Sequence, residues 1–323
     1  MSEQFVYQVA RIRSLETSLL SGAAIEQLIA CPDFAQCINF ITERGWGRSG
    51  AVNESAEDIL EAEEEKIRST LNELRIDNKY FDVLLLPKSF HNLKTAIKDA
   101  VAETLTKEAY YRNALLSPEE IAEIIRGKEF GKLPPYMQKC AEEAFESLLH
   151  TGDGQLCDII VDRACLDAIT EVGKSSGEEV IQDYAERTVA LSNIKIAVRS
   201  SKTGKGAEFM KRAMSPCATI DTGRLAKAAE AGFDALKEYI STTKYADSAE
   251  ALSESHSAFE KWCDDAMIKS LKAQKYNSFS IGPVLAYVIA RENEIKAVRI
   301  ILSGKLNGIS DASIRERVRE MYV

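Results

Sequence analysis

The chain has 323 residues, of which 45% are hydrophobic and 28% are charged. This composition is typical of folded proteins and unlike that of disordered chains. A single hydrophobic core organises at most about 250 to 300 residues, so two or three domains are expected. The formal net charge of -9 disfavours binding to nucleic acid, which is a polyanion.

The first residues, Met1 to Phe5, contain no basic region followed by an apolar segment. We therefore expect no secretion signal and a cytoplasmic location. The most apolar stretch, residues 281–290, is only ten residues long and contains Gly282 and Pro283. A membrane-spanning helix needs about 20 apolar residues, so we expect any membrane association to pass through partner proteins.

Four segments along the chain share the pattern of a helix start. In each, a Ser or Asp precedes a helical stretch, where its side-chain oxygen can accept a hydrogen bond from an unpaired first-turn amide. Pro118 stands at a first helical position, where its missing N–H costs nothing. The predicted N-caps are Ser21, Ser117, Asp221 and Ser310.

Apolar residues recur at steps of three and four between segments rich in Gly and Pro. The predicted loops are 45–50, 131–135, 151–154 and 201–206. We find no convincing set of alternating strands, so the predicted fold class is all-α. The two clearest stripes are Leu86, Phe90, Leu93, Ile97 and Val284, Val288, Ile295, Val298, Leu302.

Charged residues cluster in two further places. The acidic run Glu61, Glu63, Glu64 and Glu65 lacks the Gly-bearing loop of calcium sites, which favours a solvated helix face. Near the end of the chain, Arg315, Arg317 and Arg319 alternate with Glu316 and Glu320. In a last helix, Glu316 with Arg319 and Arg317 with Glu320 would form opposite-charge neighbours three residues apart.

A unit of about one hundred residues is repeated. The segment 91–94 (HNLK) recurs as 192–195 (SNIK) and 293–296 (NEIK), so the three lysines are 101 residues apart. Such a unit is large enough to be a small helical bundle. We predict three similar bundles with approximate bounds 1–112, 113–213 and 214–323.

Recurrence of the same residue types suggests a surface that faces one partner. An ordinary solvated helix flank is the alternative, because long lysine stems commonly lie on apolar neighbours. The predicted interface residues are Asn92, Lys94, Asn193, Lys195, Glu294 and Lys296.

A rival interpretation is nucleotide binding. Residues 168–175 (AITEVGKS) fit a relaxed phosphate-loop pattern with Lys174 as the cation. Residues 158–172 have the pattern of a helix, however, whereas a phosphate loop follows a strand, and Glu171 would place a negative charge beside the phosphates.

The sequence contains no evident catalytic constellation or metal-ligand spacing. The three histidines are scattered, without zinc or Ser-His-Asp spacing, and the seven cysteines include no Cys-x-x-Cys pair. We expect reduced, buried cysteines and predict neither a catalytic residue, nor a cofactor, nor a metal.

Residues 282–296 (GPVLAYVIARENEIK), 299–309 (RIILSGKLNGI) and 314–323 (IRERVREMYV) resemble the C-type subunit of bacterial and archaeal V-type ATP synthases, the counterpart of the eukaryotic d-type subunit. Residues 7–16 (YQVARIRSLE) and 91–94 are similar to other landmarks of that family, so the resemblance covers the whole chain. Ser89-Phe90 stands where the family often has an acidic residue, and Ala290-Arg291 where Lys-Glu is common.

The resemblance implies a funnel of three helical domains around a pseudo-threefold axis. It implies a non-catalytic rotor subunit, seated on the membrane proteolipid ring, that receives the lower end of the axle formed by D-type and F-type subunits. Such a subunit transmits torque and is peripheral to the membrane. The alternative from the residues alone is a free-standing helical-repeat scaffold that binds peptides.

Overall fold

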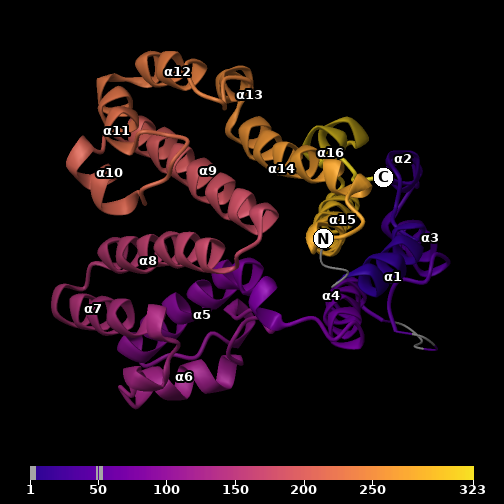
Figure 1. The fold of residues 1–323 in the computed structure, drawn as a ribbon, viewed down its shortest axis with the longest axis horizontal. Helices are drawn as coiled ribbons and strands as arrows, with labels where there is room; N and C mark the ends of the chain where they lie inside the picture. Colours follow the sequence, from indigo (N-terminus) through magenta and orange to yellow (C-terminus); the bar gives the residue numbers. More distant parts are fainter. Residues whose placement is uncertain (1–4, 49, 51–53) are drawn as a thin grey trace. The chain divides into compact units, whose positions relative to one another are not determined.

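The computed structural model describes residues 5–48, 50 and 54–323. Within these ranges the chain forms sixteen α-helices and four short 3-10 turns, without a strand (Figure 1). The predicted all-α fold class is therefore confirmed. Residues 1–4, used above to predict the nature of the N-terminus, and Ser49 of the predicted loop 45–50 lie outside the described residues.

The chain divides into two compact units. The end unit combines Met1–Asp77 with Asp247–Val323, and the middle unit is Asn78–Ala246. This division groups segments by contact rather than by sequence similarity, so the three-bundle division at 1–112, 113–213 and 214–323 stays a prediction.

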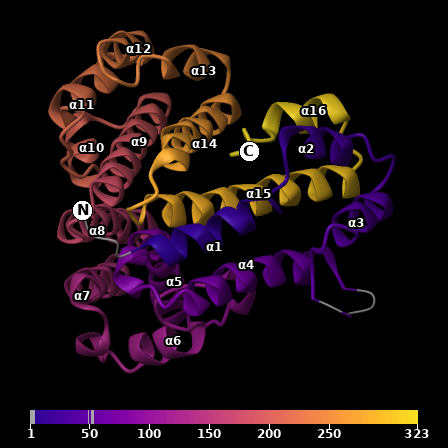
Figure 2. The same cartoon turned by 45° about the vertical axis from the view of Figure 1, so that its right-hand side comes forward.

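The end unit is built around α15, a helix of 25 residues. Helices α1, α3, α4 and α14 pack against it, and Figure 2 shows α1 and α4 running along its length. The predicted stripe from Val284 to Leu302 is buried along α15. The helices of this unit are α1 (Val6–Glu16), α2 (Gly22–Ile29), α3 (Phe34–Thr42), α4 (Ala56–Glu73), α13 (Ser248–Glu254), α14 (His256–Lys272), α15 (Gly282–Leu306) and α16 (Asp311–Arg317), with η4 (Ala273–Tyr276).

The middle unit is organised by three long helices, α5, α8 and α9. Helix α8 packs against α5, α7 and α9, and the predicted stripe from Leu86 to Ile97 is buried on α5. The elements of this unit are η1 (Asn78–Tyr80), α5 (Asp82–Ala102), η2 (Lys107–Ala109), α6 (Pro118–Arg126), η3 (Phe130–Lys132), α7 (Pro135–Thr151), α8 (Gly154–Ser175), α9 (Glu179–Thr203), α10 (Ala207–Ala213), α11 (Thr222–Ala231) and α12 (Phe233–Ser241).

All four predicted N-caps are confirmed. Ser21 accepts from the backbone N–H of Ala24, and Asp221 and Ser310 cap α11 and α16 in the same way. Ser117 forms a capping box with Glu120, and α6 begins at Pro118 as expected. Each cap pairs one first-turn amide that would otherwise lack a partner inside the helix.

Two local predictions differ from the structure. Helix α9 continues to Thr203, so the break predicted at 201–206 begins only with Gly204, whose positive φ of 66° ends the helix. The predicted ion pairs in the last helix are wrong, because α16 ends at Arg317 and Val318 is extended. Arg319 instead pairs with Asp264 at 2.9 Å and Glu320 with Lys272 at 2.6 Å, both on α14.

Candidate partner-binding groove and buried charge cluster

The three repeated lysines lie on three long helices, α5, α9 and α15. Lys94 forms an ion pair with Asp162 of α8 at 2.7 Å, and Lys296 pairs with Asp264 of α14. Burial tends to raise the pKa of Asp264, but Lys296 and Arg319 outweigh burial and hold that pKa below its usual value. In each of these two cases the lysine ties its helix to another long helix of the same unit.

The residues two positions before these lysines are buried. Asn92 donates to the carbonyl of Tyr111 at 2.7 Å and accepts from the N–H of the same residue at 2.8 Å. Asn193 makes the same reciprocal pair with Ser215, at 2.7 and 3.0 Å. Both amides therefore hold the chain segment that leads to the next capped helix.

Glu294 stands two residues before Lys296, as Asn92 and Asn193 stand before Lys94 and Lys195. It is 2% exposed, and its carboxylate accepts from the backbone N–H of Leu20, the residue before the first N-cap. Helix α15 is thus joined to a segment near the other end of the chain. Of the six predicted interface residues, Asn92, Asn193 and Glu294 are buried in internal contacts. Lys94 and Lys296 also form ion pairs within their own units.

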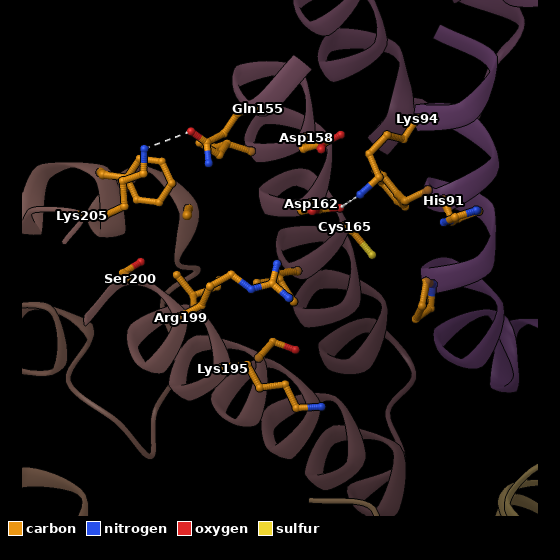
Figure 3. A pocket seen from close by; sticks show the side chains of 18 of the residues that line it. His91, Lys94, Gln155, Asp158, Asp162, Cys165, Lys195, Arg199, Ser200 and Lys205 are labelled. Carbon is orange, nitrogen blue, oxygen red and sulfur yellow. Dashed lines mark hydrogen bonds and ion pairs between the residues drawn. The ribbon is translucent and has the colours of Figure 1, made fainter. Parts of the chain in front are cut away.

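A groove of about 610 Å³ runs between helices of the middle unit. Lys94 and Lys195 both line it, together with residues of α8 and α10 (Figure 3). Its apolar lining includes Phe90, Ile159, Leu166, Ile169, Ile196 and Phe209.

Both carboxylates that line the groove are paired with lysines of α5. Asp162 binds Lys94, and Asp158 binds Lys98 at 2.6 Å. Arg199 is exposed and also lines the groove; it has no hydrogen bond or ion pair through its guanidinium within the described part of the chain. The α9 wall therefore presents a cation that the protein itself does not neutralise.

The end unit contains a buried charge cluster that sequence reasoning missed. Arg291 of α15 donates to Glu294 and to Glu63 of α4. The side chain of Arg291 is 8% exposed and that of Glu63 is 2% exposed. Glu63 also accepts from Lys66 at 2.6 Å and from the N–H of Gly47 at 2.9 Å. The expectation of a solvated acidic face is wrong for Glu63.

Two residues at this cluster stand out in the sequence, although neither predicts a buried ion pair. Arg291 is one of the departures from the family pattern, and Trp46, whose ring centroid lies 5.2 Å from the Arg291 guanidinium, stands in a loop between two glycines. Burial raises the pKa of Glu294 even though Arg291 opposes that shift. Buried charges of this kind are stable only when all partners are present, because removal of one leaves an uncompensated charge away from water.

The phosphate-loop pattern at 168–175 lies within α8. No strand precedes it within the described residues, and Gly173 serves packing, because a Cβ at that position would lie 2.4 Å from the Cβ of Ala185 on α9. Among the described residues, no group of three or more His, Cys, Asp or Glu side chains is placed to hold a metal ion. None of the seven cysteines forms a disulfide, and Cys31 and Cys217 are only half-buried.

None of the helices in the described ranges combines the length and apolar character needed to cross a lipid bilayer.

Comparison with known proteins gives consistent matches along the chain. A family model described as ATP synthase (C/AC39) subunit matches residues 8–317. The C subunit of the V-type sodium ATPase of Enterococcus hirae is 22% identical, over 96% of this chain and 97% of its own length. The C subunits of the A-type ATP synthases of Methanocaldococcus jannaschii and Pyrococcus furiosus are 22% and 24% identical, over 96% and 98% of this chain and 85% and 90% of their own lengths.

Proposed function

The chain belongs to the ATP synthase (C/AC39) subunit family, and we propose that it is the central-stalk rotor subunit that couples the axle to the membrane proteolipid ring. As a member of this family it is a structural, non-catalytic subunit of a V-type or A-type ATP synthase complex. Its proposed task is to transmit torque between two partners.

The observation that carries this proposal is that α15 is buried and is joined by polar contacts to other segments of the end unit. This buried helix of 25 residues is about 37 Å long at 1.5 Å per residue. Arg291 and Glu294 join it to α4 and to Leu20, so the N-terminal part of the chain is fixed to this stiff element. A coupling between two rotating parts must resist twisting, and a packed helix with buried polar pairs resists deformation.

The proposed partners are D-type and F-type axle subunits on one side and the proteolipid ring on the other. The protein would lie on the cytoplasmic side, peripheral to the membrane and attached through these partners. Lys296 is exposed, and exposed charges of this kind change the rate and the salt dependence of association with a partner protein.

Isolation of the intact complex from membranes in mild detergent tests the proposal. We expect the chain to copurify with the axle subunits and the proteolipids. Amine-reactive cross-linking should connect Lys94, Lys195 or Lys296 to those subunits. Consistent recovery with stator subunits alone, or outside the complex, would contradict a rotor position.

The groove in the middle unit also favours a second candidate, the free-standing scaffold that binds peptides. That function predicts an elongated particle in which the groove is reached from solvent. Small-angle X-ray scattering of the isolated protein separates the two, because a rotor adapter with a funnel shape gives a compact distance distribution.

A further inference from the structure

The groove in the middle unit is long. Its lining residues on α8 run from Gln155 to Ile169, and those on α9 from Thr188 to Thr203. At 1.5 Å per residue, each wall extends for about 21 Å, which is roughly four helical turns. A volume of 610 Å³ lies within the range of about 300 to 1,000 Å³ of small-molecule sites, but a compact ligand would leave most of this length unfilled. The shape fits an extended occupant.

The lining of the groove combines apolar and polar side chains. Ile159 and Ile196 are large aliphatic residues that remain partly exposed there. Thr188, Ser192 and Thr203 line the same groove from α9. An amphipathic helix matches such a surface, because its apolar residues recur on one face while its flanks are polar.

The charge of the groove is opposite to that of the protein. The whole chain has a formal net charge of -9, whereas four cations, Lys94, Lys195, Arg199 and Lys205, line the groove against two carboxylates. Figure 3 shows the Arg199 side chain extending from α9 toward α8, while Lys205 approaches Gln155 at 3.1 Å. A guanidinium without an internal partner is suited to a bidentate bond with a carboxylate.

We infer that this groove receives an amphipathic helix of another subunit, with apolar side chains against Ile159 and Ile196 and an Asp or Glu that pairs with Arg199. The inference rests on the proposed function in one respect, that the helix comes from a subunit of the same rotary complex. Recognition then combines burial of apolar surface with a charge pair, as in other helix-in-groove interfaces.

Photo-cross-linking in the assembled complex tests the inference. Ile196 is replaced by p-benzoylphenylalanine, and the exposed Lys227 of α11, outside the groove, receives the same replacement as a control. We expect the groove probe to react with a single peptide segment of another subunit that has apolar residues at steps of three and four and at least one carboxylate. The control probe should not react with that segment.

Charge reversal gives a second readout. Arg199→Glu should lower the cross-linking yield about tenfold at low salt, and Lys227→Glu should leave it unchanged. Reversal of the partner carboxylate to Arg should restore the yield in the Arg199→Glu background. Circular dichroism of both variants checks that the helices remain folded.

The outcomes distinguish failure of the groove inference from failure of the proposed rotor function. If the complex assembles with axle and ring but the groove probe reacts with no subunit, or reacts with lipid, the groove inference is wrong and the rotor function stands. If the chain does not assemble with those subunits at all, the proposed function fails instead. A cross-linked segment without carboxylates, or a yield insensitive to Arg199→Glu, would overturn the charge pair.

Discussion

Replacement of Arg291 by Met should destabilise the end unit far more than the same replacement of an exposed arginine on the same helix. Met retains the apolar stem of the side chain but leaves Glu63 and Glu294, each 2% exposed, without their shared cation. Removal of one partner from a buried ion pair typically costs about 3 to 5 kcal/mol. Glu63 keeps its contacts with Lys66 and the Gly47 N–H, and Glu294 keeps its contact with the Leu20 N–H. We therefore expect a loss in the free energy of unfolding in the lower half of this range, about 3 to 4 kcal/mol.

The pH dependence of this loss follows from the sign of the pKa shift. Burial raises the pKa of Glu294 above its usual value, and loss of the cation should raise it further. A carboxyl group with a raised folded-state pKa favours the folded protein below its unfolded-state pKa, and this contribution disappears as the pH rises through the folded-state pKa. Arg291→Met should therefore be less destabilising near pH 5 than near pH 8.

Urea denaturation monitored by circular dichroism measures the effect, and fluorescence of Trp46, which lies beside Arg291, reports on the end unit. Arg299→Met is the matched control. Arg299 is on α15, its side chain is 43% exposed, and it pairs with Glu57 at the surface, so its loss should cost less than about 1 kcal/mol. An equal effect of the two substitutions, or a larger loss for Arg291→Met at pH 5, would refute the reasoning.

Three further substitutions test the packing and electrostatics. Asn193→Ala removes both hydrogen bonds to a buried backbone segment and should lower the free energy of unfolding by about 3 kcal/mol in urea titrations. Gly173→Ala places a methyl group against Ala185 and should cost about 1 to 3 kcal/mol, seen as a lower melting temperature. The pKa of Asp264 is lowered despite burial because of cations such as Lys296, so its stabilising contribution is present above its usual pKa of about 4 and is lost as the pH falls through the folded-state pKa. Asp264→Asn should remove that part of the acid sensitivity in a pH titration of stability.

Each of these three substitutions has a control elsewhere in the chain: Gly154→Ala for Gly173→Ala, Asn307→Ala for Asn193→Ala, and Asp234→Asn for Asp264→Asn. Gly154→Ala adds a methyl group where no atom lies within 4 Å, and Asn307→Ala removes a side chain that is exposed at the end of α15. Asp234→Asn affects a carboxylate whose side chain is 97% exposed beside Lys237. Control effects as large as those of the buried positions would contradict the assigned contacts.

The repeat located two lysines of the groove, but it did not show the role of the residues it aligned. The 101-residue spacing identified Lys94 and Lys195, and both line the groove. The same spacing grouped Asn92 and Asn193 with them as surface residues, whereas their amides are buried against Tyr111 and Ser215. Sequence position placed these residues on equivalent helices, but it did not show which way each side chain faces.

The sequence by itself determined the local helical structure. A Ser117 or Ser310 cap depends on amides three residues away, and the stripe from Leu86 to Ile97 depends on helical periodicity. Only the tertiary structure brought Arg291 to Glu63, 228 residues apart, and Glu294 to Leu20, 274 residues apart. Contacts of that kind form when the two ends of the chain pack together around α15. No pattern within a few helical turns encodes that closure, because it depends on how helices from both ends of the chain pack in one core.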